Sequence, residues 1–553
     1  MATNEIYYEN LDALIEKCIS SYNENGQHLA SKQSNRSRQQ LARFSELFHN
    51  QSHTLSRLVQ ERINQLKSDN CIVIMTAHQP NFFPYDGVMR KATLAYVLAK
   101  RIEQELKLPV INIFGIADQD FGTDRWIKTM SLPDPERRDG ILELRLTVPE
   151  KRMLNRIKKP SESTLNFLKK EIESWVNKEL NLIKQAKDIA ALSNEQEAKI
   201  RENLRKLWKI IDEANSSSAV LSDFNAFVMS KIVNEIWGYD TLFFRFSECQ
   251  QFFLDEFSFL LSNFDDYSDA LKQVVSSTHA LNGIPETEWN LAPFWYHCDC
   301  GSKVRLEVIK QSDHYYGIGN CILCDKRQEF DFGIIGQANI ETIISKISAR
   351  SISMPLVILN GLGVSCYIGG QGGKDYLLQA NEVAKILDIY FPPIVVWRPK
   401  DQYRGLGQLS SLVIIKRIVG SANQHEIDNA KTDLETKIQK INSQIDTLEE
   451  KKKEILKTSK DASKPLLYID IIRELSYRQN EIRKNEKYPE IVRNLSLLNN
   501  ALAALALHPS IVDYALSIGL KETSDQWVNS LQTTEGWTKG CQMKTIITYV
   551  NDQ

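Results

Sequence analysis

Hydrophobic and polar positions follow a strand–helix–strand pattern over residues 71–121. Two short apolar runs, Cys71–Thr76 and Val110–Ile116, predict buried strands, and the amphipathic run Val88–Leu106 between them predicts a helix of about five turns. Elements in this order form a βαβ unit, and its right-handed crossover makes the two strands parallel. The pattern therefore predicts an α/β fold built on a parallel sheet.

The same kind of pattern returns near residue 354. Apolar runs at Met354–Leu359, Ser365–Ile368 and Ile394–Trp397 predict three more parallel strands, and Lys374–Leu387 predicts a helix before the last of them. Together, the two sets of strands predict one Rossmann-like parallel sheet core. The mainly helical residues 125–290, which separate the two sets, then form an insertion.

Residues 425–485 are highly charged, and apolar side chains recur among them at heptad spacing. The seam consists of Ile427, Leu434, Ile441, Leu448 and Ile455, with Ala430, Ile438 and Ile445 between them. This spacing predicts a coiled coil. A tip near Asp461–Pro465 and a return seam of Ile471, Leu475 and Ile482 make it antiparallel. We expect it to form a homodimer, and a self-contained hairpin is the alternative.

These patterns divide the chain into seven expected regions. The regions are a helical arm (1–68), the first half of the Rossmann-like core (69–124), a helical insertion (125–290), a zinc-ribbon-like insertion (291–335), the second half of the core (336–420), a coiled-coil hairpin (421–490) and a C-terminal helical region (491–553).

The charge balance excludes several classes of partner. The 553 residues include 68 Lys and Arg against 70 Asp and Glu, a net charge of −2, so no bulk attraction to nucleic acid or a membrane surface is expected. No apolar run reaches the roughly 18 residues that span a bilayer. The opening residues, MATNEIYYENLDALIEK, carry acids and lack the apolar segment of a signal peptide. We expect a cytoplasmic protein with small-molecule substrates.

Four of the nine cysteines form two close pairs that flank a strand-like segment, Lys303–Lys310. The pairs are Cys298 with Cys300 and Cys321 with Cys324. Thiolate pairs on tight turns are typical of structural zinc sites, and four thiolates leave no open position for catalysis. His297 can replace one thiolate, and ordinary reduced cysteines are the alternative.

Two polar segments and one glycine-rich turn are expected at the carboxyl edge of the sheet. His78–Gly87 follows the first strand, Asp118–Asp120 follows the second, and Gly369–Gly373 opens a helix after a later strand. Ligands of open α/β sheets bind beyond this edge, and the helix start at Gly87 suits a phosphate. The nearby stretch Lys346–Ser351 is interpreted as ordinary helix-end residues.

These segments resemble three motifs of the bacillithiol-biosynthesis cysteine-adding enzymes, the BshC family, and the resemblance covers most of the chain. Thr76–Gln79 with Lys91 resembles the first motif, and Ala117–Phe121 the second, although the family's Glu and His are Ala117 and Gln119 here. The third motif is matched by Tyr367–Gly370, Gly372, Tyr376 and Gln379. A late strand end of the family corresponds to Val396–Pro399.

The resemblance implies a class I aminoacyl-tRNA-synthetase-like nucleotidyl-transferase core and a carbon–nitrogen ligase. ATP with Mg²⁺ would activate the carboxylate of cysteine, and the amine of an amino-sugar conjugate such as glucosaminyl-malate would attack it. The expected catalytic residues are His78, Lys91, Asp118 and Asp120. The expected nucleotide-binding residues are Gln79, Asn81, Gly87, Gly369, Gly370, Gly372, Tyr376, Gln379 and Arg398.

Each expected residue meets a need of the reaction. Phosphates need positive charge or N–H donors, which His78, the Gly87 helix start, Lys91 and Arg398 can supply. Asp118 and Asp120 can bind an ammonium group or Mg²⁺. Two other functions stay open: another ATP-dependent ligase or nucleotidyl transferase on the same core, and a non-catalytic scaffold that binds partners through the cysteine-rich insertion and the coiled coil.

Overall fold

The centre of the protein is a five-stranded sheet in which all neighbouring strands are parallel. The computed structural model describes residues 7–29, 32–68, 70–277, 288–397, 401–459 and 465–549. The strand order is β13 (Ile394–Val396), β12 (Cys366–Gly369), β1 (Ile72–His78), β2 (Val110–Ile116) and β6 (Leu242–Arg245). The predicted Rossmann-like α/β core is therefore confirmed.

Both faces of this sheet are buried. Alternate residues of β1 point to opposite faces, so Ile72 and Ile74 pack with α1 (Leu11–Leu29) and α4 (Asp86–Leu106). Val73 and Met75 share the other hydrophobic cluster with α2 (Lys32–Gln51), α3 (Arg57–Leu66) and α11 (Lys374–Ile386). Burial on both faces explains the nearly continuous apolar runs of these strands.

The order of the strands reverses at β1. From β1 the chain adds β2 and β6 on one side, and it later returns to add β12 and β13 on the other. The sheet thus has a switch point between β1 and β12, where open α/β sheets bind ligands. The hydroxyl of Thr76 donates to the carbonyl of Ile368 at 3.0 Å and ties these two strands together near their carboxyl ends.

Two local predictions near residue 350 are wrong. Met354–Leu359 is not a strand, because Pro355–Leu359 forms a wide helical turn that is buried on all sides. An apolar run of this length does not distinguish a buried strand from a buried helix. The stretch Lys346–Ser351 is not the end of an α-helix either: a single 3-10 turn ends at Lys346, and β11 (Ile347–Ala349) then pairs with β7 (Leu291–His297).

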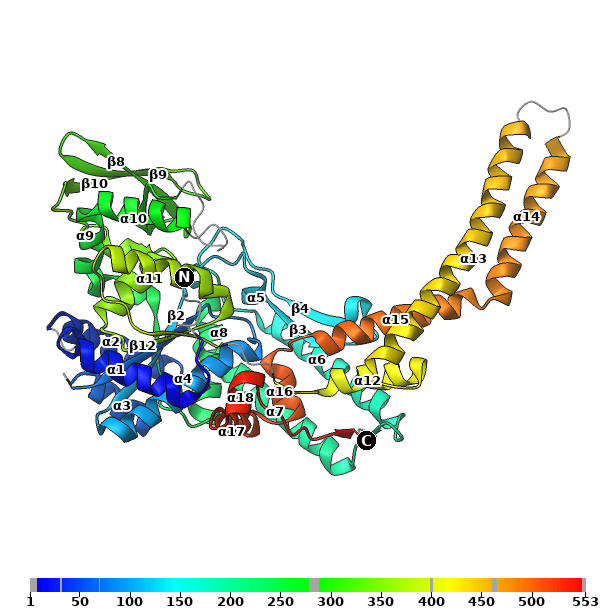
Figure 1. Ribbon diagram of the computed structural model, residues 1–553, viewed down its shortest axis with the longest axis horizontal. Coiled ribbons are helices and arrows are strands. Elements are labelled where there is room, and N and C mark those ends of the chain that lie inside the picture. The colour runs from blue at the N-terminus through cyan, green and yellow to red at the C-terminus, as the bar shows by residue number, and fades with distance from the viewer. Residues whose placement is uncertain are drawn as a thin grey trace.

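The cysteine-rich insertion forms a second, antiparallel sheet. Its order is β10 (Arg327–Ile334), β9 (His314–Asn320), β8 (Lys303–Gln311), β7 (Leu291–His297) and β11. Helices α9 (Leu254–Ser262) and α10 (Phe264–Ser277) precede it in the chain. In Figure 1 this sheet stands at one end of the molecule, above α11.

The segment between β2 and β6 is largely helical, but β6 is a strand of the central sheet that lies inside residues 125–290, so these residues are not one helical insertion between the two halves of the core. Its elements are α5 (Arg125–Lys128), β3 (Thr129–Pro133), β4 (Ile141–Arg145), α6 (Glu162–Lys184), β5 (Ala190–Ala191), α7 (Asn194–Ser217) and α8 (Leu221–Ser230). The remaining elements follow β13: α12 (Leu406–Val419), α13 (Gln424–Ser459), α14 (Pro465–Asn485), α15 (Tyr488–Ala506), α16 (Ile511–Ser517), α17 (Leu520–Leu531), α18 (Thr534–Lys539) and β14 (Thr548–Tyr549). No helix of the described ranges is long and apolar enough to cross a bilayer.

Helices α13 and α14 form an antiparallel hairpin that projects far from the body (Figure 1). Gln479 donates to the carbonyl of Ile445 at 3.1 Å, and the seam residues Ile441 and Leu475 are buried. The placement of Ile471 in the seam is wrong, because 38% of its surface is exposed while the next residue is half-buried. Residues 461–464 of the expected tip lie outside the described residues. Supercoiling and dimerisation remain predictions.

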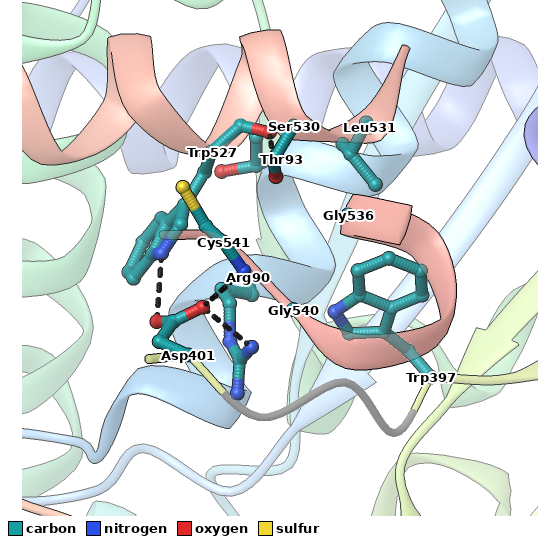
Figure 2. A pocket seen from close by; sticks show the side chains of 10 residues that line it. All are labelled: Arg90, Thr93, Trp397, Asp401, Trp527, Ser530, Leu531, Gly536, Gly540 and Cys541. Atoms are coloured by element: carbon teal, nitrogen blue, oxygen red, sulfur yellow. Dashed lines mark hydrogen bonds and ion pairs between the residues drawn. The ribbon is translucent and has the colours of Figure 1, made fainter. Parts of the chain in front are cut away.

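The C-terminal helices are anchored to α4 by a buried aspartate. The carboxylate of Asp401 accepts hydrogen bonds from Arg90 of α4 (3.1 Å), Tyr514 of α16 (3.0 Å) and Trp527 of α17 (2.9 Å). Figure 2 shows Asp401 between the guanidinium of Arg90 and the indole of Trp527. Burial raises the pKa of Asp401, and the charge of Arg90 opposes that rise. The last region of the chain, for which no motif suggested a role, therefore packs directly behind the first loop of the core.

Because Asp401 holds the C-terminal helices on α4, we expect a large loss of stability when its side chain is removed. Asp401→Ala should lower the free energy of unfolding by about 3 kcal/mol, because it removes one partner of a buried ion pair. Urea unfolding followed by tryptophan fluorescence measures the loss. The control is Asp433→Ala, whose carboxylate pairs with Lys437 on the exposed surface of α13 and should change stability little. Equal losses in the two variants would contradict a central role of Asp401.

Candidate ligand pocket and cysteine cluster

A cavity of about 500 Å³ lies beyond the carboxyl ends of β1 and β12. It therefore occupies the switch point of the sheet. Seven of the residues expected from the sequence line it, and they come from both halves of the core: His78, Gln79, Lys91, Asp120, Gly370, Gly372 and Tyr376. The turns that carry His78 and Gly370, which are far apart in the chain, thus face a single cavity.

Lys91 lies in the second turn of α4 and is almost fully buried beneath the cavity. Its Nζ donates to the carbonyl of Ala77 at 3.0 Å. A Cβ atom at Gly370 would lie 3.7 Å from this Nζ, so the ammonium sits beside the glycine-rich turn. Burial lowers the pKa of Lys91 to about 7. The side chain is therefore poised between its neutral and charged forms, and an anionic ligand would favour the charged one.

His78 ends β1 and is half-buried. Its Nδ1 lies 3.0 Å from the carbonyl oxygen of Gln79. Because a carbonyl only accepts hydrogen bonds, Nδ1 carries the proton and Nε2 is an acceptor. Burial lowers the pKa of His78 to about 3, and the nearby charge of Lys91 adds to this effect. The histidine is thus neutral at pH 7, so of the two contributions expected of it, positive charge or an N–H donor, it does not supply the positive charge.

The two aspartates of the second motif have different environments. Asp120 faces the cavity, where Oδ2 accepts a hydrogen bond from Nε2 of Gln79 (2.9 Å) and Oδ1 lies 3.7 Å from Nζ of Lys303. Asp118 is fully buried and accepts from the backbone N–H (3.0 Å) and the hydroxyl of Ser247. Burial raises the pKa of Asp118. Asp118 therefore holds loops together below the cavity, and the expected pair of carboxylates does not converge on a ligand.

The start of α4 is not open to a phosphate. The ring of Tyr85 covers Gly87, where a Cβ atom would fall 2.5 Å from it. Asp86 occupies the first turn of the helix and forms an ion pair with Arg90 at 2.7 Å. The carboxylate of Asp86 already complements the positive end of the helix dipole. Gly87 itself does not line the cavity.

Three other expected residues, Gly369, Gln379 and Asn81, also lie away from the lining. Gly369 packs against Leu377 of α11, and Gln379 is buried on the same helix. Asn81 lines a separate, much smaller cavity together with His508. Arg398, which was also expected to bind the nucleotide, lies outside the described residues.

The pocket has a wall that the sequence did not suggest. Trp295 of β7, Lys303 of β8 and Arg350, which follows β11, line the cavity from the antiparallel sheet. The cationic groups of Lys303 and Arg350 lie 5.7 Å and 5.5 Å from the centre of the Trp295 ring, within the range of cation–π attraction. The cysteine-rich insertion therefore contributes directly to the pocket. In the sequence, the one feature that could have indicated this wall is that Trp295 and Lys303 flank the first cysteine pair.

The four predicted cysteines form one cluster. All four Sγ atoms lie within 4.8 Å of one another, with 3.7 Å between Cys298 and Cys324 and 3.4 Å between Cys300 and Cys321. Tetrahedral zinc with Zn–S bonds near 2.3 Å requires S–S separations of about 3.8 Å, so the geometry is compatible with structural zinc. His297 is not part of the cluster, since its Nε2 lies 2.9 Å from the hydroxyl of Ser348. No second group of this kind occurs within the described ranges.

The comparison with known families agrees with the Rossmann-like fold. The family model of the bacillithiol biosynthesis protein BshC, N-terminal Rossmann-like domain, matches residues 16–398. The chain belongs to the BshC family. Membership implies an enzyme of bacillithiol biosynthesis. No curated protein matches the chain.

The lowered pKa of Lys91 predicts a specific dependence of stability on pH. In the unfolded chain the pKa returns to 10.5, so unfolding takes up a proton at pH values between about 7 and 10.5, and stability rises with pH in this window. From about pH 7 to pH 9, Lys91 should contribute about 2 kcal/mol to this rise. Lys91→Met removes the contribution.

Urea unfolding of both proteins across this pH range measures the effect. The difference in unfolding free energy between wild type and Lys91→Met should change by the stated amount. Arg101→Met, at a surface ion pair on the same helix, should keep the wild-type slope. Parallel curves for wild type and Lys91→Met would show that Lys91 has an ordinary pKa.

Proposed function

We propose that the protein is an ATP-dependent carbon–nitrogen ligase that adds cysteine to an amino-sugar conjugate through an activated carboxylate. One observation carries the proposal: the His78 turn and the Gly370 turn line the same cavity at the switch point of the sheet. Two separate turns that face one cavity suit a nucleotide, which has a phosphate chain and a base to hold. Family membership supports the same assignment.

The phosphates of ATP belong beside Lys91 in this proposal. The Gly370–Gly373 turn opens α11, so N–H groups of a helix start are close to the Lys91 ammonium. Gly370 and Gly372 lack side chains that would keep a ligand away from the backbone. Lys91 in its charged form would offset charge that develops on phosphorus oxygens during transfer.

The reaction has two balanced steps. A carboxylate oxygen of cysteine attacks phosphorus of ATP, and either ADP or pyrophosphate leaves, which gives an acyl phosphate or an acyl adenylate. The amine of the acceptor then attacks the activated carbonyl carbon, an amide bond forms, and phosphate or AMP leaves with its bonding electrons. Asp120 binds the ammonium group of cysteine or of the acceptor, and the acceptor amine loses its extra proton before it attacks.

Mg²⁺ belongs with the nucleotide in this proposal. Asp120 and Asp124 are the carboxylates of the lining, and a magnesium ion usually takes one or two protein carboxylates together with substrate phosphates. The ion would neutralise phosphate charge. The cysteine cluster holds structural Zn²⁺, which four thiolates exclude from direct catalysis.

A second candidate is another ATP-dependent ligase or nucleotidyl transferase on the same core. The family's histidine in the second motif is Gln119 here, which lines the cavity and lies 3.3 Å from Nε2 of Gln250. A neutral amide in this place favours a different set of hydrogen bonds from a titratable imidazole. This observation favours another amine acceptor, or another ATP-dependent ligase reaction on the same core.

A cytoplasmic homodimer completes the proposal. The α13–α14 hairpin leaves several large apolar side chains exposed at its surface: Leu456, Ile469, Ile471 and Tyr477. Because the hairpin projects from the body (Figure 1), a second copy can cover these side chains without obstructing the pocket.

Nucleotide affinity tests the phosphate assignment. Lys91→Met should weaken ATP binding at least about tenfold in calorimetry, since it removes a buried ammonium beside the glycine turn. Affinity of the wild type should fall as the pH rises through about 7, because the ligand binds the charged form of Lys91. Arg101→Met is the matched control and should bind as the wild type does. Absence of any ATP affinity in the wild type would favour the scaffold function.

Thiol analysis of cells tests the reaction itself. Cells that lack the protein should lose the cysteine conjugate and accumulate its amino-sugar precursor. Complementation with His78→Ala or Asp120→Ala should fail although both variants fold, because neither side chain is part of the hydrophobic core. Unchanged low-molecular-weight thiols in the deletion strain would rule out a bacillithiol-type role and leave the second candidate.

A further inference from the structure

The cysteine cluster lies next to two residues of the pocket wall. Cys298 and Cys300 occupy the turn between β7 and β8, with Trp295 on the first strand and Lys303 at the start of the second. Lys303 is almost fully buried, and its Nζ lies 3.7 Å from Oδ1 of Asp120. A small movement of this turn would therefore move the ammonium that faces the carboxylate of the pocket.

The turn that carries the second cysteine pair is hydrogen-bonded to the backbone of Lys303. The backbone N–H of Ile322 donates to the carbonyl of Lys303 at 3.1 Å, and Cys321 forms a bridge with Val304. The backbone of Lys303 is thus held between the two thiolate pairs. A metal ion that joins the pairs would fix the distance between them and the position of Lys303.

A short segment, Met153–Asn155, connects the first cysteine turn to the acidic strand end. The N–H of Met153 donates to the carbonyl of Gly301 at 2.9 Å, and the N–H of Leu154 donates to the carbonyl of Asp120 at 3.0 Å. Gly301 has a φ of +86° and a would-be Cβ 3.2 Å from Arg156, so only glycine suits this close contact. The backbone of the turn is therefore continuous, through hydrogen bonds, with the backbone of Asp120.

We infer that the four-cysteine metal site is a positioning element of the ligand pocket, which holds Trp295 and Lys303 in the wall and keeps Asp120 in place. Two independent connections lead from the cluster to Asp120, one through the Lys303 side chain and one through Met153–Asn155. Groups that support a site from outside its first layer of contacts typically change its affinity or activity about 10–100-fold. The inference adds to the proposed zinc site a role in ligand binding, and it rests on that site.

Hydrogen exchange measured by mass spectrometry tests this coupling without requiring a known ligand. The full-length protein is compared with bound zinc, after removal of zinc by a chelator, and after zinc is restored. Without zinc, amides of residues 117–121 and 153–156 should exchange at least about tenfold faster, because their hydrogen bonds lose a fixed partner. Amides of β12 and α11, on the other side of the pocket, should keep their rates.

Two variants distinguish the effect of losing the metal from the effect of changing the turn that binds it. Cys324→Ser removes an exposed ligand and should reproduce the zinc-free exchange pattern, with less zinc by elemental analysis. Leu323→Ser, at an exposed neighbour in the same turn, should keep both the metal and the wild-type pattern. Where Cys324→Ser does not fold, the reversible chelation of the wild type gives the answer.

Three results would overturn the inference. The first is faster exchange confined to residues 298–326, which would show that the metal stabilises only the cysteine-rich turns and not the pocket. The second is a purified protein without bound metal. The third is a Leu323→Ser variant that exchanges as the zinc-free protein does. A protein that binds no ATP but shows the expected exchange pattern would count against the ligase proposal alone.

A binding measurement adds a readout of the pocket itself. Lys303→Met should retain its zinc and its fold, and it should weaken ATP binding, because the ammonium that faces Asp120 is lost. Zinc removal should weaken binding further in this variant, but by less than in the wild type, because only the connection through Met153–Asn155 is left to break. Equal losses on zinc removal in the wild type and in Lys303→Met would show that the metal does not act through Lys303.

Discussion

Strands β1 and β12 are neighbours in the sheet although 292 residues separate Thr76 from Ile368, which are joined by a hydrogen bond of 3.0 Å. Parallel pairing brings the carboxyl ends of both strands to the same edge, so the turn after each strand opens onto the same space. The placement of Lys91 follows from this pairing as well, because α4 packs on β1 and its second turn reaches the glycine turn after β12. The pocket exists only while these two strands remain adjacent.

The pocket contains buried ammonium groups whose burial lowers the folding stability of the protein. Lys91 and Lys303 are buried cations, and burial lowers the pKa of both. A buried ammonium costs free energy in the empty protein, and a phosphate or carboxylate that pairs with it removes that cost. Functional groups held at the expense of stability are common in binding sites. The carboxylate of Asp120 pairs with Lys303 and also accepts a hydrogen bond from Gln79.

Much of the fold follows from local patterns, and much of the site does not. The limits of β2 and of the helix after the glycine turn agree closely with prediction, because apolar runs and a glycine turn are local signals. The four cysteines were recognisable because metal sites require close ligand spacing. Met354–Leu359 was misjudged because complete burial removes the periodicity that separates a helix from a strand.

The site residues that were predicted are those on local sequence motifs, and those that were missed depend on contacts between distant parts of the chain. Residues on motif turns, such as His78 and Gly370, were identified, whereas Asp118 was indistinguishable from Asp120 until Ser247 was seen to bind it. Trp295, Lys303 and Arg350 reach the pocket through contacts between distant parts of the chain, which no local pattern records. A C-terminal helical region was expected, but its packing on α4 through Asp401 was missed for the same reason.

The central claim is that one nucleotide is held by both turns, and a crystal structure with a non-hydrolysable ATP analogue tests it most directly. The account predicts phosphate oxygens within hydrogen-bond distance of Lys91 Nζ and of backbone N–H groups of the Gly370–Gly373 turn, with His78 in contact with the same ligand. An analogue bound elsewhere on the protein, with this cavity empty at saturating concentration, would contradict it.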